Sequence, residues 1–592
     1  MRIAALVKQI PAFEAMALGP DGRLVREGLP LELNAYCRRA VAKGAELAQA
    51  TGGTCTVITL GPPSAEDCLR EAIAWGCDDG VLISDPALAG SDTLATARAL
   101  AAALERLGPF DLVLTGRNSV DADTGQVGAQ VAELAGLAFA AGVKELTLDG
   151  DVALVRCEED DGYSDRQVRL PAVLSCAERL CDPAKVDPEG RAAVDAARIT
   201  TLTAADLGPG PWGQDASGTY VGEVRVLDVA REGRVLDGPV AQQVRDAVKL
   251  LLDRGALAAA SDVVAAGPAL GAPLPPGGPA VAVAVEPARA NVARELLGAA
   301  HRLAAEIGGS VVAIAPDGSD PDELGSWGAD EAVVVAGADT EEDVAAALIA
   351  WVRNREPWAL LLPSTTWGRE VGGRTAAAVG AGLTGDAVDL EVSTAATTGA
   401  AQLLAWKPAF GGQMVAAIYC SSPVQMATVR AGVLPAPEPR PRVATATSTI
   451  SAAPRARVAI TASVRDDDLD ALAHAPFVVG VGAGVQPDEY GAIEELAVAL
   501  GAEVAATRKV TDKAWLPRAR QIGITGRSIA PQLYIGIGLS GKFNHTVGVR
   551  AAGTVLAINT DPTAPIWRFA DIGIVADWHE VVPLLTAALT AG

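Results

Sequence analysis

The chain is poor in aromatic side chains, which make up 4% of its 592 residues, although half of the residues are apolar. Its cores must therefore be built mostly from alanine, valine, leucine and isoleucine. This composition is typical of parallel sheets that are flanked by helices. At about 150 residues per domain, the length predicts three or four domains.

Positive charge is also scarce, because 48 Lys and Arg stand against 72 Asp and Glu, a net charge of −24. Such a surface repels nucleic acid and anionic lipid, and it favours protein partners with basic patches. No apolar run reaches the ~18 residues of a transmembrane helix. The opening MRIAALVKQIPAFEAM lacks the small-residue cleavage site of a signal peptide. We therefore expect a cytoplasmic protein that does not insert into membranes.

Cysteine and histidine are few, and their spacing does not match a metal site. The eight cysteines form no C-x-x-C pair, and the chain has only four histidines. A metal centre built from these ligands is not expected. We expect scattered, buried and reduced thiols instead.

A weak internal repeat divides most of the chain into two related halves. TGGTCTVITL (51–60) and AWGCDDGVLIS (74–84) correspond to IGGSVVAIAP (307–316) and SWGADEAVVVA (326–336). In each half, short β-branched runs alternate with alanine-rich amphipathic stretches. This alternation predicts β-α-β units and two related parallel-sheet α/β domains of the nucleotide-binding type.

A third α/β domain follows from Phe477, where the alternation of strand-like and helix-like stretches resumes. Residues 240–254 read as a helix that ends at Gly255. The stretch 255–280 is rich in Ala, Gly and Pro and reads as a linker. The proline-rich and then extended stretch 435–475 is expected to contain a hinge. The predicted domains are 1–254, 281–475 and 476–592, the last being doubly wound.

A G-x-G-x-x-G motif at Gly536, Gly538 and Gly541 lies between two apolar runs in that last domain. Glycines at this spacing let a main chain approach a dinucleotide pyrophosphate. A nicotinamide site usually has an acidic residue about 20 positions further on. Here the second run ends in Asn559, and Asp561 lies just beyond it. The motif alone leaves the dinucleotide open.

Longer stretches make the resemblance specific. ATRKVTDKAWLPRARQIGITGRSIAPQLYIGIGLSGKFNH (505–545) and DIGIVADWHEVVP (571–583) resemble the FAD domain of the electron-transfer flavoprotein alpha subunit. The first 250 residues look like the beta subunit of that family, in LVKQIP, TGRNSVDADTGQVGAQVAEL and LPAVLSCAERLCDP. The chain therefore resembles a beta–alpha fusion that would replace the usual heterodimer.

The resemblance implies an FAD in the C-terminal domain. Arg508 would lie over the flavin ring, Thr525 at its N5 atom, and His545 at its pyrimidine carbonyl, where positive character favours anionic flavin. The whole implied set is Thr507, Arg508, Gly523, Thr525, Ser540, Gly541, His545, Asn559 and Asp577. Each has an ordinary alternative; Asp577, for example, could simply cap the last helix. Ala483 departs from the family, which has arginine there.

A second nucleotide, either AMP or a second FAD, is implied in the N-terminal half. The segment 90–96 and the stretch 123–127 look like those of two-flavin, electron-bifurcating members. Alternatively, Asp123 or Thr124 could only N-cap the following helix. The corresponding loop TTWGREVGG of the second half lacks paired aspartates and is expected to be scaffold only. The implied residues are Leu6, Asn34, Cys37, Asp92, Thr93, Thr96, Gly116, Asp121, Asp123, Thr124, Gln126 and Val127.

By this resemblance the protein is an electron carrier without a substrate of its own. Electrons would pass from a flavoprotein dehydrogenase, through FAD, toward a quinone reductase of the membrane. Leu180 matches the leucine with which the beta subunit docks on the dehydrogenase; a lone leucine more often packs in a core. The alternatives are a bifurcating protein that oxidises NADH at a second FAD, an NAD-dependent oxidoreductase, and a structural scaffold.

Overall fold

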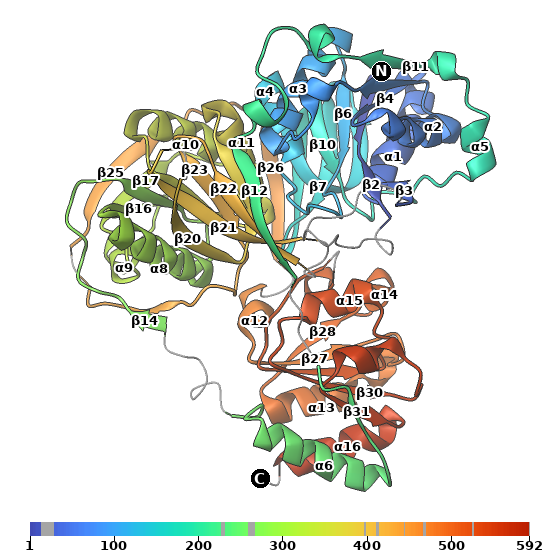
Figure 1. Ribbon diagram of the computed structural model, residues 1–592, viewed down its shortest axis with the longest axis vertical. Helices are drawn as coiled ribbons and strands as arrows, with labels where there is room; N and C mark the ends of the chain where they lie inside the picture. Colours follow the sequence, from blue (N-terminus) through green and yellow to red (C-terminus); the bar gives the residue numbers. More distant parts are fainter. Residues whose placement is uncertain are drawn as a thin grey trace. The chain divides into compact units, whose positions relative to one another are not determined.

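The computed structural model describes residues 1–12, 29–226, 231–258, 267–395, 398–409, 414–442, 444–465, 469–523 and 526–590 (Figure 1). Its contacts divide the chain into two units. Unit 1 comprises Met1–Arg225, Pro268–Phe410 and Val415–Val464, and unit 2 comprises Val226–Gly267, Gly411–Met414 and Arg465–Gly592.

The first half of unit 1 is built on one large sheet, parallel along β11 to β7 and antiparallel through β8 and β9. Its strands in spatial order are β11 (Ile199–Leu202), β5 (Asp79–Ile83), β4 (Thr54–Leu60), β1 (Arg2–Val7), β6 (Leu112–Gly116), β10 (Ala172–Cys176), β7 (Ala138–Asp149), β8 (Val152–Glu158), β9 (Gly162–Arg169) and β26 (Val458–Arg465). The connecting helices are α1 (Cys37–Thr51), α2 (Glu66–Trp75), α3 (Thr93–Leu107) and α4 (Val127–Ala135).

The second half repeats this plan, as the sequence repeat predicts. Its parallel sheet has the order β19 (Gly382–Ala387), β23 (Gln425–Val429), β18 (Ala359–Pro363), β15 (Ala280–Ala284), β16 (Ser310–Pro316), β17 (Glu331–Ala336) and β25 (Ala446–Ser451). Helices α8 (Ala290–Ile307), α10 (Glu341–Arg355) and α11 (Thr366–Val379) connect its strands. A smaller sheet has the order β12 (Thr219–Val226), β22 (Met414–Cys420), β21 (Ala401–Ala409) and β20 (Asp389–Thr394).

The two halves of unit 1 exchange strands. β12 comes from the first half but pairs with β22 of the second half, and β26 comes from the second half but adds to β9 of the first. Figure 1 shows the green β12 beside the yellow β22, and the orange β26 at the side of the first-half sheet. Each half thereby covers one sheet edge of the other, and main-chain hydrogen bonds join the halves.

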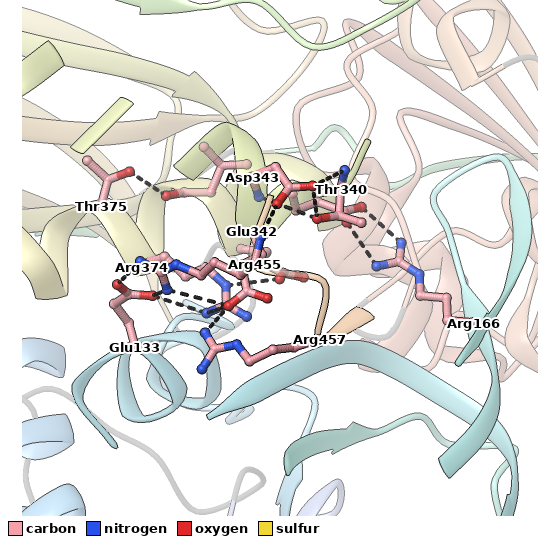
Figure 2. Close-up of polar contacts among 12 residues, drawn as sticks. Glu133, Arg166, Thr340, Glu342, Asp343, Arg374, Thr375, Arg455 and Arg457 are labelled. Atoms are coloured by element: carbon pink, nitrogen blue, oxygen red, sulfur yellow. Dashed lines mark hydrogen bonds and ion pairs between the residues drawn. The ribbon is translucent and has the colours of Figure 1, made fainter. Parts of the chain in front are cut away.

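A buried ion network reinforces this junction (Figure 2). Arg374 of α11 is fully buried, and its guanidinium contacts Glu370 at 3.1 Å, Glu133 of α4 at 3.2 Å and Glu342 at 3.5 Å. Arg455 binds Glu133 at 2.8 Å. The network therefore couples the α4 and α11 helices, one from each half.

The cores are made of small aliphatic side chains, as the composition predicts. In the first-half sheet Ile3, Val57, Leu114 and Leu174 are fully buried, and the strands of the second half contribute residues such as Val281. Strands covered by helices on both faces need apolar residues at consecutive positions, which the sequence provides.

Unit 2 is a doubly wound parallel sheet. Its order is β28 (Glu503–Ala506), β27 (Phe477–Val481), β29 (Leu533–Ile537), β30 (Thr554–Asn559), β31 (Ile572–Val575) and β13 (Arg234–Leu236). Figure 1 shows α6 (Val240–Asp253), α13 (Tyr490–Leu500) and α16 (Trp578–Thr590) together on one side of this sheet. The predicted fold class, two related parallel α/β domains with a doubly wound C-terminal domain, is confirmed.

The predicted domain boundaries differ from this division. The helix expected at 240–254 exists as α6, but it belongs to unit 2 and not to the first domain, because Val244 and Leu251 pack into the core of the C-terminal sheet. Of the predicted linker 255–280, β14 (Gly267–Ala269) is a strand that pairs with β24 (Pro437–Glu438), and 259–266 lie outside the described residues.

The expected hinge region 435–475 is largely regular structure. It contains the edge strands β25 and β26 and the short helix α12 (Leu469–His474), and the chain passes into unit 2 at Arg465; residues 443 and 466–468 lie outside the described residues. The extended character that the sequence indicates is confirmed for these strands. Among the residues that the structure describes, no helix is both long enough and apolar enough to cross a membrane.

Candidate functional site

The order of the unit 2 strands creates a switch point between β27 and β29. From β27 the chain moves outward to β28 and then returns to the other side of β27 as β29. The loops that leave neighbouring strands at such a point diverge, and ligands of open α/β sheets bind there, beyond the carboxyl ends of the strands. The loop after β27 and the G-x-G-x-x-G loop after β29 lie at this point.

Glycines let the loop after β29 approach both the loop after β27 and the segment after β30. A Cβ on Gly482 would collide with the carbonyl oxygen of Gly538, and a Cβ on Gly541 would collide with the main chain of Ile566. Gly538 and Gly541 also have positive φ angles of 63° and 73°, which side chains rarely tolerate. The motif therefore fixes the main chain at the switch point.

The residues predicted for FAD lie mainly along the carboxyl edge of the same sheet. Thr507 and Arg508 follow β28, Ser540 and Gly541 follow β29, and Asn559 ends β30. Ser540 is exposed. The Asn559 side chain donates to the Leu539 carbonyl and accepts from the Asp561 N–H, which braces the loop after β29.

Arg508 begins the short helix α14 (Arg508–Asp512), with Thr507 at its N-cap position. Its guanidinium Nε lies 3.1 Å from the Asp512 carboxylate, and its side chain is 42% exposed. A cation is thus held at the carboxyl edge with access to solvent. Its stacking on a flavin ring remains a prediction.

His545 lies in α15 (Phe543–Thr546) and is buried. Its Nε2 atom is 2.7 Å from the Tyr534 hydroxyl, and its Nδ1 atom is 3.3 Å from the Ile522 carbonyl oxygen. A carbonyl can only accept, so Nδ1 carries the proton and Nε2 accepts from Tyr534. Burial lowers the pKa of His545 to about 4, so the imidazole is neutral near pH 7. This differs from the positive character that the resemblance implied.

Asp577 precedes α16, and its carboxylate accepts from the main-chain N–H of His579 at 3.0 Å. It therefore caps the last helix, which was the alternative reading of this residue. The His579 ring bridges Asp577 at 2.6 Å and Glu489 at 2.9 Å, and these carboxylates raise the pKa of His579. A role of Asp577 at the adenosine of a nucleotide stays a prediction.

Two predicted residues lie between Ile522 and Arg527. Gly523 has a φ of 126°, and its N–H donates to the Arg527 carbonyl, so it closes a tight loop that requires glycine. Thr525 lies outside the described residues.

The donor set of this edge fits a dinucleotide pyrophosphate. The Ser540 hydroxyl and the main chain of the glycine loop lie at the switch point, and the Arg508 guanidinium follows β28 along the same carboxyl edge; all of these groups suit an anion.

A second switch point lies in the first half of unit 1, between β1 and β6. β4 and β5 lie on one side of β1, and β6 lies on the other. Leu6 is buried inside β1, and Gly116 ends β6, where its missing side chain leaves room for the Cys37 main chain. Asn34 is fully buried and donates to the Asn118 carbonyl at 2.8 Å. The predicted residues Leu6, Asn34, Cys37 and Gly116 thus meet here.

The loop after β6 is tied to the end of β1 by an ion pair that was not predicted from the sequence. Lys8 lies directly beyond β1, and its ammonium binds Asp121 at 2.7 Å. Burial raises the pKa of Asp121, but Lys8 outweighs it and the pKa is lowered. The position of Lys8 immediately after a buried strand, in the quoted LVKQIP stretch, is a signal that could have found it.

The segment 90–96 adjoins the same loop. Asp92 caps α3 by accepting from the Ala95 N–H at 2.9 Å, and it also accepts from the Thr219 N–H. The Thr93 hydroxyl donates to Gln126 Oε1 at 3.2 Å. Thr96 lies in the first turn of α3, with its N–H bonded to the Asp92 carbonyl. The two segments predicted to recognise the second nucleotide are therefore in contact.

Helix α4 starts later than the capping alternative requires. It begins at Val127 with Gln126 at the N-cap position, and no side-chain hydrogen bond from Gln126 closes it. Asp123, with a positive φ of 45°, instead accepts from the Asn118 side chain. The alternative in which Asp123 or Thr124 only N-caps this helix is wrong.

Comparison with known proteins gives two matches along the chain. Residues 21–207 and 282–456 match the electron transfer flavoprotein domain, and residues 471–550 match the electron transfer flavoprotein FAD-binding domain. The chain belongs to the electron transfer flavoprotein family.

Relatives of both subunits match this electron transfer flavoprotein. The subunit beta of Thermoanaerobacterium thermosaccharolyticum is 34% identical over 43% of this chain and 99% of its own length. The subunit alpha of the same organism is 34% identical over 50% of this chain and 92% of its own length. Protein FixB of Bradyrhizobium diazoefficiens is 37% identical over 51% of this chain and 85% of its own length. The chain is therefore a fusion of beta-like and alpha-like sequences, with an FAD-binding domain.

Leu180 of this flavoprotein lies in a turn after β10, with its N–H bonded to the Ala177 carbonyl. Its side chain is half-buried and packs against the core of the first-half sheet. Part of the leucine is thus used for packing, and its use in partner docking stays a prediction.

Proposed function

We propose that this electron transfer flavoprotein accepts electrons from flavoprotein dehydrogenases and passes them toward a quinone reductase, in the cytoplasm. The observation that carries the proposal is the glycine-lined switch point of unit 2. When bound there, FAD supplies the redox chemistry, and the chain binds and orients it. No proton-transfer dyad is needed for this role.

Within the proposed site, Ser540 and the main chain around Gly541 hold the pyrophosphate, and Arg508 supplies a cation beside the flavin. Thr507 and Asn559 line the same edge. A contact between His545 and the flavin would have to replace one of its two hydrogen bonds, to Tyr534 or to Ile522. We therefore assign His545 as a neutral hydrogen-bonding group.

The proposal includes a second nucleotide, AMP or FAD, at the switch point of the first half. The convergence of Asn34, Cys37 and the 121–127 loop supports it, as does the Lys8–Asp121 pair. The segment 90–96 contacts this loop through Thr93 and Gln126.

Cofactor extraction with identification by mass tests both sites. We expect FAD in a 1:1 ratio to the chain from unit 2, plus AMP or a second FAD. In Gly541→Ala the new Cβ collides with the Ile566 main chain, so the unit 2 FAD should be lost while the second nucleotide stays. Gly501→Ala is the matched control, because Gly501 has a similar φ of 64° but open space around it. Wild-type protein without FAD would overturn the proposal.

The alternative proposal is electron bifurcation, in which a second FAD in the first half oxidises NADH. The contact of the 90–96 segment with the 121–127 loop favours it, since both segments resemble those of bifurcating members. Addition of NADH alone to the purified protein should then bleach the flavin absorbance. AMP as the second nucleotide, or no bleaching, would reject this alternative.

A further inference from the structure

The start of helix α4 does not face solvent on all sides; the second half of unit 1 packs against it. Gly373 of α11 lies against the Gln126 carbonyl and Ala129, where a Cβ would already be crowded. The Arg369 side chain lies against Gly125. The loop predicted to hold a nucleotide phosphate therefore forms a junction between the beta-like and alpha-like sequences.

Three cations from the second half gather at this junction. Arg430 Nε lies 3.2 Å from Asp386, Arg369 lies 3.8 Å from the same carboxylate, and the Lys407 ammonium donates to the Gly385 carbonyl at 2.7 Å. The acidic groups that face them are Asp386 and, across the junction, Asp123. Three positive charges thus stand against two negative charges in a largely buried place.

The pKa shifts of Asp386 and Lys407 reflect the charges that surround them. Burial raises the pKa of Asp386, but Arg430, Lys407 and Arg369 outweigh it and lower the pKa to about 2. Burial lowers the pKa of Lys407, and Asp386 and Asp123 act against that shift. Asp386 is engaged by both arginines, whereas Asp123 accepts from the Asn118 side chain, so within the described residues the three cations share Asp386 as their ion-pair partner.

An unpaired donor lies at the same spot. The Gln126 side chain is fully buried, and its Oε1 atom accepts from Thr93, which leaves its Nε2 group as a donor. That Nε2 group has no hydrogen-bond partner within the described parts of the chain. It lies beside Gly385, whose carbonyl already takes the Lys407 ammonium. A buried donor without an acceptor is costly, and an anion oxygen would satisfy it.

The equivalent helix of the second half shows what occupies such a place. At the start of α11, the Thr366 N–H donates to the Asp160 carboxylate at 2.7 Å, and the neighbouring Asp161 binds Arg289 at 3.2 Å. The Thr365 hydroxyl binds Glu286 at 2.7 Å. A carboxylate from the first half therefore fills the anion position at α11, whereas at α4 the second half supplies three cations around its own Asp386.

We propose that Lys407, Arg369 and Arg430 complete a site for a phosphate-class anion at the start of α4, so that a nucleotide phosphate is held by both halves of the chain. The anion preference stands on the charges and the unpaired Gln126 donor. Its assignment to a nucleotide rests on the second nucleotide of the proposed function.

The test uses the full chain with Lys407→Met, which removes the charge at nearly constant length, and Lys407→Arg, which keeps it. Lys144→Met is the control, since Lys144 stacks on Tyr163 in the first-half sheet. The first readout is the second nucleotide retained per unit 2 FAD. The second is the rise of the unfolding temperature with inorganic phosphate, against sodium chloride of equal ionic strength.

We expect Lys407→Met to retain at least about tenfold less of the second nucleotide, with Lys407→Arg and Lys144→Met close to wild type. If wild type carries no second nucleotide, a phosphate-induced rise that Lys407→Met loses still supports the anion site, and only the nucleotide assignment fails. Wild-type retention and wild-type phosphate response in Lys407→Met would overturn the inference. Arg369→Gln, at a partly exposed position, gives the same readings should Lys407→Met not fold.

Discussion

The buried ion network between the two halves offers a quantitative test of what holds unit 1 together. Replacing Arg374 by methionine removes a fully buried guanidinium that contacts three carboxylates. Two of them keep other partners, because Glu133 retains Arg455, and Glu342 retains Arg455 and Arg457. The loss of stability therefore arises mainly at the third carboxylate, Glu370, which is left without its ion-pair partner.

Arg374 is the ion-pair partner of Glu370 within the described ranges. Removing one member of a buried pair costs about 3–5 kcal/mol, because a charge is left buried without compensation. Burial already raises the pKa of Glu370 to about 7, against the opposing effect of Arg374. The loss should lie near the lower end of that range, about 3 kcal/mol at pH 8, because Glu370 can take up a proton instead.

The sign of the pH dependence follows from the raised pKa. The folded state binds the Glu370 proton more tightly than the unfolded state, so this stabilising contribution is present at low pH and is lost as pH rises through about 7. In Arg374→Met the pKa of Glu370 rises further, because the guanidinium that lowers it is gone. The difference in stability between variant and wild type should therefore be larger at pH 8 than at pH 6.

Urea unfolding followed by tryptophan emission measures this effect. A loss of about 3 kcal/mol corresponds to a midpoint lower by roughly 0.5–1 M. Adding Glu370→Leu to Arg374→Met should recover more than half of the loss, since the uncompensated carboxylate is gone. Arg353→Met on the exposed side of α10 is the control and should change the midpoint little. A loss below about 1 kcal/mol in Arg374→Met, or no recovery in the double variant, would refute the reasoning.

Three further predictions concern single side chains. Arg508→Ala should keep FAD but lose the red absorbance of the one-electron-reduced flavin during dithionite titration, whereas Lys509→Ala should keep both; unchanged red absorbance in Arg508→Ala contradicts the assigned role. Leu180→Ala should slow flavin reduction by the partner dehydrogenase without lowering the unfolding temperature, and a large drop in that temperature would identify a purely structural leucine. Burial raises the pKa of Glu286 to about 8, so its stabilising contribution is lost as pH rises through about 8. Glu286→Gln should flatten the fall in unfolding temperature between pH 6 and pH 9. If the unfolding temperatures of variant and wild type fall in parallel over this range, the prediction is wrong.

The fold could be predicted because the strands and helices of each repeated unit are marked by their own local hydrophobic patterns. Strands such as SVVAIAP (310–316) are apolar at every buried position after Ser310, and the helices between them carry one apolar face. The unit or sheet to which a single helix or strand belongs could not be predicted. α6 is amphipathic wherever it packs, and β26 has mostly exposed side chains that would suit any sheet edge.

The candidate site was predictable to the same extent. Residues at or shortly after the end of a strand, such as Asn559 and Ser540, had to lie at the carboxyl edge once the sheet was parallel. The environment of His545 was not predictable, because its partner Tyr534 lies inside a strand and faces it only through the folded sheet. Lys407 could not be linked to Gln126 either, since they lie 281 positions apart along the chain.

The second half of unit 1 has a switch point between β15 and β18, with the same topology as the one between β1 and β6 but with different charges around it. Beyond the first strand of each repeat stands the cation Lys8 in the first half and, in the second half, Glu286, whose raised pKa of about 8 leaves its carboxyl group mostly uncharged near pH 7. The first loop then meets cations of the other half, whereas the second meets the carboxylate of Asp160. An anionic ligand would be attracted at α4 and repelled at α11, so duplication of the fold need not duplicate the ligand. If the proposed anion site at α4 exists, its three cations come from the second half, just as the Asp160 carboxylate at α11 comes from the first, and the association of the two halves and the choice of the anion-binding repeat then depend on the same interface.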